Sequence, residues 1–234
     1  MAKRTESPGG VPDKTVSDPA AAVAGVRDGA VVLVGGWGGI GVPEELIGAV
    51  AASGVTDLVL ASNNCGMGRP GDVGQLFRNG QVRRAIATFP AHPAATDFRT
   101  RFENGEVELE LIPQGTLAER LRAAGAGLGG FFTPTGAGTR LTAGRETRVI
   151  DGLPHILEPP LRGDMALIKA DQADGLGNLR FRYAARGLNP IMAMAARTTV
   201  VQADELVPVG GIHPDDVHLP GIFVDRVLVT GGGR

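Results

Sequence analysis

Cysteine is almost absent from this chain. Cys65 is the single thiol among 234 residues, so no disulfide can form within the chain, and a cytoplasmic location is expected. Charge of one sign is also missing, because the formal net charge is −2, which gives no electrostatic reason to expect nucleic acid or an anionic membrane as a partner. No apolar run approaches the length of a membrane span, and the first residues lack the apolar segment of a signal peptide.

Metal-ligand patterns are equally scarce. His213 and His218 are the closest pair among the four histidines, and their spacing is not that of a zinc site. The segment from Asp171 to Asn178 resembles a calcium loop but lacks the terminal glutamate, and a turn before a strand explains it equally well. We therefore expect no bound metal and no permanently bound cofactor.

Glycine and proline are plentiful, with 36 and 16 residues, and they cluster at the ends of apolar runs. This pattern predicts many short turns between strands and helices. Asp18 and Thr116 are placed to cap two of the helices. The predicted helices cover residues 19–26, 43–54, 71–80, 95–105, 116–127 and 190–197, and the predicted strands cover 30–36, 57–64, 82–89, 107–115, 165–170, 179–183 and 198–205.

This alternation predicts an α/β fold with an open, mostly parallel sheet flanked by helices. No repeat and no obvious linker divides the chain, so residues 18–230 are expected to form a single domain. Residues 1–17 are polar and contain a Ser-Pro-Gly-Gly breaker, which predicts a disordered or loosely attached leader. The last four residues are expected to be frayed.

The first motif that could carry chemistry is glycine-rich and follows the strand at 30–36. Residues 36–41 satisfy G-x-G-x-x-G, the pattern of dinucleotide-binding loops. The next strand ends in Ala61-Ser62-Asn63-Asn64 instead of the acidic residue that binds a ribose, and Trp37 would crowd a pyrophosphate, so NAD is not favoured. The glycines then either allow a tight turn or let backbone N–H groups face an anion or oxyanion.

Two further motifs follow strands. Asn63 and Asn64 end a central strand, where open α/β sheets bind ligands, although asparagines at such ends also simply make turns. Gln114 lies at the entrance of the helix at 116–127 and could donate to a substrate carboxylate. Cys65 is more typical of a small buried thiol than of a nucleophile. Glu103 precedes Asn-Gly, which is either a catalytic context or a common turn dipeptide.

In combination these motifs resemble the A (alpha) subunit of the family I coenzyme A transferases, which include the 3-oxoacid and 3-oxoadipate enzymes. The resemblance runs from Asp28-Gly29 through VVLVGGWGGIGVP, SNN, VELELIPQGTLAER and FFTPTGAGT to VHLPGIFVDRV, about nine-tenths of the chain. Trp37 stands where the family usually has phenylalanine. The resemblance implies an open parallel sheet of the kind also seen in sugar-phosphate isomerases.

The resemblance also implies a mechanism. A glutamate of the partner B (beta) subunit, in a Ser-Glu-Asn-Gly context, attacks an acyl-CoA and passes through an acyl anhydride to a glutamyl-CoA thioester. Asn63 and Asn64 would support that glutamate or an oxyanion, and Gln114 would bind substrate together with Gly35, Gly36, Trp37 and Gly38. Glu103 would be a turn residue in the wrong subunit. The isolated chain should be inactive, with a heterotetramer as the expected active form.

The resemblance leaves the acceptor acid open. We expect succinyl-CoA as donor and 3-oxoadipate as acceptor, with acetoacetate the alternative; a CoA-ester hydrolase and a nucleotide-binding oxidoreductase are further alternatives. A dicarboxylic acceptor needs a second cation in the pocket. Four arginines could supply it, although a solvated surface position is the usual state of each: Arg69, Arg99, Arg101 and Arg162.

Overall fold

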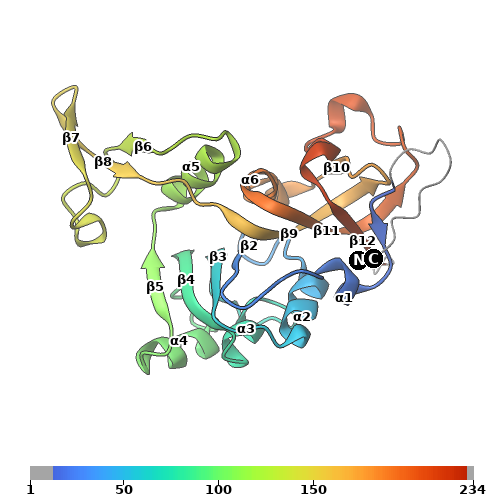
Figure 1. Cartoon of the computed structure of the whole chain (residues 1–234), viewed down its shortest axis with the longest axis horizontal. Coiled ribbons are helices and arrows are strands. Elements are labelled where there is room, and N and C mark those ends of the chain that lie inside the picture. The colour runs from blue at the N-terminus through green and yellow to red at the C-terminus, as the bar shows by residue number, and fades with distance from the viewer. Residues whose placement is uncertain (1–12, 231–234) are drawn as a thin grey trace.

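A nine-stranded sheet forms the middle of the molecule in the computed structural model, which describes residues 13–230 (Figure 1). Eight strands follow the order β1-β12-β11-β9-β2-β3-β4-β5, and every neighbouring pair is parallel. Strand β10 pairs antiparallel with β9. The strands are β1 (Thr15–Val16), β2 (Val31–Val34), β3 (Leu58–Asn64), β4 (Val82–Phe89), β5 (Glu108–Leu111), β9 (Gly163–Asp174), β10 (Leu179–Arg180), β11 (Ala196–Val207) and β12 (Arg226–Val229).

Helices cover both faces of this sheet. Because connections between parallel strands are right-handed, the face that a connecting helix covers depends on the direction in which the chain crosses the sheet. The chain crosses the sheet in one direction from β2 to β5 and in the opposite direction from β9 to β11. One layer holds α1 (Pro19–Ala22), α2 (Glu44–Ser53), α3 (Gly74–Arg78) and α4 (Thr96–Glu103), and the other holds α5 (Gln114–Gly125) and α6 (Asn189–Ala195). Short 3-10 helices span Arg140–Thr142, Tyr183–Arg186, Pro214–Asp216 and Gly221–Phe223.

The two helical layers explain the uninterrupted apolar run of β2. Val32 and Val34 pack in the layer of α1 to α4, whereas Leu33 between them packs in the layer of α5 and α6. All three side chains are buried, because both faces of a parallel strand are covered. The structure therefore confirms the predicted α/β class with an open, mostly parallel sheet flanked by helices.

Two predictions near the amino terminus have different outcomes. Asp18 caps α1 as expected, since its carboxylate accepts the N–H groups of Ala20 and Ala21. Residues 1–12 of the predicted leader lie outside the described residues, as do the predicted frayed residues 231–234. The rest of the leader is attached: β1 pairs with β12, and Lys14 Nζ donates to the carbonyl oxygens of Gly221 and Val224 at 2.6 and 2.7 Å.

Two other local predictions are wrong. Thr116 does not cap α5, because Pro113 occupies the position before the helix and Thr116 is buried in its first turn. Gln114 is thus the first residue of α5 instead of the end of a strand. The strand predicted at 179–183 stops at Arg180, since Tyr183 has a positive φ of 49° and begins a 3-10 turn.

A small antiparallel sheet projects from the main body, at the left of Figure 1. We call it the arm; it comprises β6 (Phe131–Thr133), β7 (Thr147–Ile150) and β8 (Leu153–Glu158), in the order β6-β8-β7. Sequence reasoning assigned no strands to this region. Asp151 and Gly152, both with positive φ, make the two-residue turn between β7 and β8.

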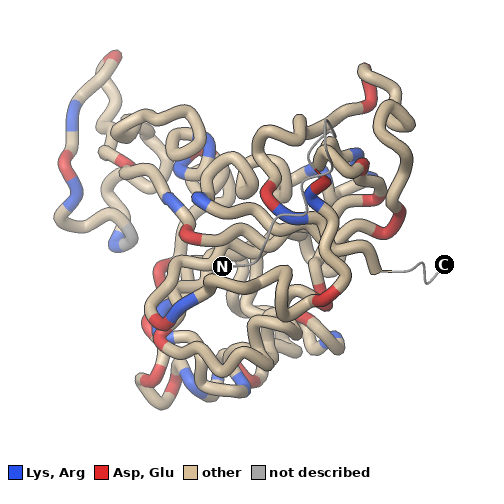
Figure 2. The backbone as a smooth tube through the Cα atoms, turned by 45° about the vertical axis from the view of Figure 1, so that its right-hand side comes forward, with Lys and Arg blue, Asp and Glu red and all other residues tan. Residues whose placement is uncertain are grey.

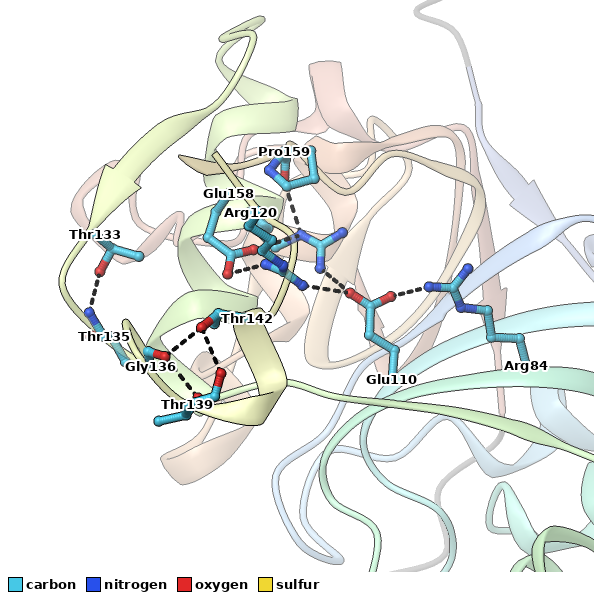
Figure 3. Close-up of polar contacts among 11 residues, drawn as sticks. Arg84, Glu110, Arg120, Thr133, Thr135, Gly136, Thr139, Thr142, Glu158 and Pro159 are labelled. Atoms are coloured by element: carbon cyan, nitrogen blue, oxygen red, sulfur yellow. Dashed lines mark hydrogen bonds and ion pairs between the residues drawn. The ribbon is translucent and has the colours of Figure 1, made fainter. Parts of the chain in front are cut away.

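Ion pairs join the arm to the sheet (Figure 3). Glu110 on β5 accepts hydrogen bonds from Arg84 on β4 and Arg120 on α5, both at 2.6 Å. Arg145, which precedes β7, pairs with Glu158 on β8 and also lies 3.6 Å from Glu110. The side chains of Glu158 and Arg120 are almost completely buried. The network therefore fixes the base of the arm against the edge of the sheet.

Elsewhere, acidic and basic residues are interspersed along the backbone (Figure 2). Among the helices of the described residues, none is long and apolar enough to cross a membrane.

Burial alone would raise the pKa of Glu110, but hydrogen bonds and charge from Arg120 and Arg84 outweigh it and hold this pKa below its ordinary value. A carboxyl with a lowered pKa in the folded state stabilises the fold above its unfolded pKa. That stabilisation is lost as pH falls through the lower, folded value.

Replacing this carboxylate tests the network. Glu110→Gln should lower the free energy of unfolding at pH 7 by about 3 kcal/mol, because it leaves the buried Arg120 without its charged partner. The difference from the wild-type protein should hold above the ordinary pKa of a glutamate, about 4.3, and shrink as the pH falls below it toward the lower pKa of the folded state. Urea unfolding at several pH values measures this, and a difference independent of pH would contradict the assignment.

Candidate active site

The polar residues expected from the sequence meet at the carboxyl edge of the sheet. Gly35 follows β2, Asn63 and Asn64 end β3, and Gln114 begins the helix that follows β5. Strands β2 to β5 are neighbours and parallel, so their carboxyl ends lie along one edge. Open α/β sheets bind ligands at this edge.

The glycine-rich segment folds into a tight turn. Trp37 and Ile40 exchange both backbone hydrogen bonds, at 2.9 and 3.0 Å, and Gly38 has a φ of 58°. At Gly36 φ is 118°, and a Cβ would lie 2.9 Å from the Val42 side chain, so only glycine fits there. Across the described residues, no acceptor binds the backbone N–H groups of Gly36 and Gly39, which leaves both free to donate.

Asn189, at the start of α6, holds the glycine-rich segment in place through hydrogen bonds. Its carboxamide accepts the Lys169 N–H and donates to the carbonyl oxygens of Gly41 and Ala185, and the residue is fully buried. A Cβ on Gly35 would lie 1.8 Å from Asn189 Oδ1. Any residue other than glycine at position 35 would therefore clash with the Asn189 amide.

Asn63 connects the glycine turn to Gln114. Its Oδ1 accepts the Gly38 N–H at 3.1 Å, and its Nδ2 donates to Gln114 Oε1 at 2.9 Å and to Thr88 Oγ1 at 3.1 Å. Thr88 is the second-last residue of β4, and its hydroxyl lies 2.6 Å from Gln114 Oε1. Both hydrogens of the Asn63 amide are therefore used within the chain.

Asn64 supports the same turn from the buried side. Its Nδ2 donates to the Gly38 carbonyl at 3.2 Å, and its Oδ1 accepts the Gly66 N–H at 3.0 Å. Only 9% of Asn64 is exposed. Asn63 and Asn64 together hold both the N–H and the carbonyl of Gly38.

A surface pocket lies beside these groups. Trp37 forms one wall with 44% of its surface exposed. Gln114 Nε2 has no hydrogen-bond partner within residues 13–230, so this amide can donate to a ligand. The pocket is lined by Trp37, Gly38, Asn63, Asn64, Met67, Thr88, Phe89 and Gln114.

Arg69 lies on the other side of the glycine turn. Its Nη1 donates to the Gly39 carbonyl at 2.8 Å, and a Cβ on Gly39 would lie 2.0 Å from that nitrogen. The loop that carries Arg69 is organised by the buried carboxylate of Asp72, which accepts the N–H groups of Met67, Arg69 and Gly74. Arg69 lines a hollow together with Gly38, Asn63 and Asn64.

Comparison with known proteins shows the family of the chain. A family model described as Coenzyme A transferase matches residues 16–230. The chain belongs to the coenzyme A transferase family. It is 47% identical to the A subunit of the 3-oxoadipate CoA-transferase of Pseudomonas putida, over 94% of this chain and 95% of that one. It is 44% identical to the A subunit of the succinyl-CoA:3-ketoacid coenzyme A transferase of Helicobacter pylori, over 92% and 91%.

A solved structure gives the same result for the fold. Glutaconate coenzyme A-transferase from Acidaminococcus fermentans superposes with a TM-score of 0.81 at 22% identity, over 93% of this chain and 75% of that one. The family match and the curated relatives together make the chain the A subunit of a CoA-transferase.

Other sequence candidates lie away from the site of this transferase subunit. Glu103 is the exposed last residue of α4, and the following turn leads to the amino end of β5, at the edge of the sheet opposite Gln114. Burial raises the pKa of the Cys65 thiol, so it stays protonated and is a poor nucleophile.

Residues considered as metal ligands form hydrogen bonds within the fold. Asp174 accepts the N–H groups of Leu176 and Asn178, as the turn interpretation predicts. His218 Nδ1 accepts the Phe181 N–H instead of facing His213. Within residues 13–230 no group of three histidine, cysteine or acidic residues could hold a metal ion.

Sequence reasoning missed Thr88 and Asn189. Thr88 is a polar residue near the carboxyl end of an otherwise apolar run, AIATF, and the same signal that identified Asn63 could have found it. Asn189 gives no such signal, because its role depends on α6 packing against the glycine segment.

The close fit between Gly35 and Asn189 predicts the effect of one methyl group. Gly35→Ala should lower the free energy of unfolding by about 3 kcal/mol, since Asn189 must move and lose buried hydrogen bonds. Gly48→Ala is the matched control: it lies within α2 with no atom near its Cβ, and it should raise stability by about 0.5–1 kcal/mol. Equal effects in urea unfolding would rule out the steric explanation.

Proposed function

We propose that the chain belongs to a 3-oxoacid CoA-transferase that moves CoA from succinyl-CoA to 3-oxoadipate. The nucleophile is a glutamate of a partner B subunit in a Ser-Glu-Asn-Gly sequence, and two copies of each subunit form a heterotetramer. The proposal is supported by the names of the relatives and by the donor groups around the pocket. Coenzyme A thioesters enter as substrates.

The observation that carries this proposal is the orientation of Gln114. Its Oε1 is held by Thr88 and Asn63, and its Nε2 remains free beside the pocket, with no partner among the described residues. When a carboxylate attacks a thioester, the thioester oxygen gains negative charge, and a donor fixed in advance stabilises that charge more than it stabilises the substrate. Gln114 Nε2 is a donor of this kind, while Gly36 and Gly39, whose N–H groups are free within the described part of the chain, line the adjoining hollow.

The two asparagines act indirectly in this scheme. Their carboxamides are already bonded to Gly38, Gly66, Thr88 and Gln114, so they hold the glycine turn and Gln114 in position. Neither candidate nucleophile weighed from the sequence of this chain fits the role, because the Cys65 thiol stays protonated and Glu103 lies at the opposite edge of the sheet. The partner subunit supplies the nucleophile.

Reconstitution with the B subunit tests these roles. The purified chain on its own should show no transfer, and the mixed subunits should be active. In the mixture, Gln114→Ala should lower kcat about 100-fold, as expected for loss of one oxyanion donor. Asn64→Ala should lower it about tenfold by loosening the turn.

Glu103→Ala serves as the control in that experiment and should keep near-normal turnover. Activity of the isolated chain, or a loss with Glu103→Ala larger than with Gln114→Ala, would overturn the assignment.

Arg69 lines the hollow across the glycine turn from the pocket, and this cation supports a dicarboxylic acceptor. Arg99 donates to the Pro93 carbonyl and Arg101 pairs with Glu106, and neither lines the pocket. Arg162 precedes β9 at the opposite edge of the sheet. Arg69 alone of the four candidates lies against the glycine turn. Among the described carboxylates, none forms an ion pair with Arg69, so its charge is available to the second carboxylate of 3-oxoadipate.

Acceptor specificity can be measured on the reconstituted enzyme. We expect a higher kcat/KM for 3-oxoadipate than for acetoacetate. Arg69→Met should lower the value for 3-oxoadipate about tenfold, through loss of one charged contact, and change that for acetoacetate much less. An equal loss for both acids would show that Arg69 only supports the turn, and hydrolysis without an acceptor would indicate a CoA-ester hydrolase.

A further inference from the structure

A single backbone group sets the direction of the hydrogen bonds around Gln114. The Gly38 N–H can only donate, so the side-chain oxygen of Asn63 must face it, at 3.1 Å. The Asn63 amide nitrogen then points the other way, toward Thr88 and Gln114. Gln114 must in turn present its oxygen to this cluster. The free end of Gln114 is therefore its NH₂ group.

Thr88 contacts both Asn63 and Gln114 and completes this group of three hydrogen-bonded side chains. Its Oγ1 accepts from Asn63 Nδ2 at 3.1 Å and lies 2.6 Å from Gln114 Oε1 and 3.0 Å from the Asn63 carbonyl. Two oxygens 2.6 Å apart repel each other unless a proton lies between them. The single hydroxyl proton of Thr88 is therefore directed at Gln114, which receives two hydrogen bonds on one oxygen.

We propose that Thr88 is a positioning residue of the transfer reaction: its hydroxyl locks the Gln114 carboxamide so that Nε2 faces the substrate. This inference rests on the proposed function. Without the hydroxyl, Asn63 alone would hold Gln114 at the start of a helix, where the residue is only partly buried. The side chain would then sample other rotamers, and its donor would face the substrate for a smaller fraction of the time.

Thr88→Val removes the hydroxyl and keeps the branched shape that suits a strand. In the reconstituted enzyme it should lower kcat/KM for the acceptor acid about tenfold, the effect of one lost hydrogen bond. Thr88→Ser keeps the hydroxyl and should stay within about threefold of wild type. Thr198→Val, near the amino end of β11 and so on the opposite side of the sheet from the carboxyl edge, is the matched control and should leave turnover unchanged.

A double-mutant cycle separates positioning from a general loss of structure. If Thr88 acts through Gln114, Thr88→Val should have almost no further effect once Gln114 is alanine. The same tenfold loss in both backgrounds, or a loss with Thr88→Ser as large as with Thr88→Val, would overturn the proposal. Thr88→Ala replaces the valine variant if the latter fails to assemble with the B subunit.

The wild-type pair controls for the underlying function. If wild-type protein and partner do not transfer CoA, the proposed function fails. If they transfer CoA but the cycle is additive, the function stands and only the role of Thr88 is rejected.

Discussion

The hydrogen bond from the Gly38 N–H to Asn63 is the interaction on which the geometry of the site depends. It fixes which end of the Asn63 carboxamide faces Gln114 and Thr88. The orientation of a carboxamide is not fixed by its shape, because its oxygen accepts hydrogen bonds and its NH₂ group donates them. A backbone amide removes that ambiguity, since it is held in the turn between Trp37 and Ile40 and cannot rotate independently. The orientation of the Gln114 Nε2 donor is thus fixed, through Asn63, by a group of the main chain.

The fold, and the placement of the candidate site residues at one edge of the sheet, could be predicted from the sequence because they depend on local patterns. Runs of strand length that are mainly apolar, separated by helical stretches, indicated β2, β3 and β4, and parallel pairing then placed Asn63 and Asn64 at one edge. Asp18 caps its helix through atoms two and three residues away. Such features need no knowledge of distant segments.

The remaining features depend on distant contacts. The strands of the arm are short, three to six residues each, and its base is held by Glu110 and Arg120 from other elements. Asn189 reaches across 148 positions to Gly41, which no local pattern reveals. The prediction for Thr116 failed because the helix begins two residues earlier, at Gln114, and Pro113, which has no N–H to lose, occupies the cap position.

Glu110 has a consequence for how the protein behaves among its neighbours. β5 is the last strand of the main sheet, and its outer edge pairs with no strand of the described residues. An open edge of this kind is a template on which other chains can add strands. Here the edge strand carries Glu108 and Glu110, and the second is engaged by arginines from three separate parts of the chain. A foreign strand that paired here would have to dehydrate these charges, so the ion pairs that hold the arm also make this edge a poor template for strand addition.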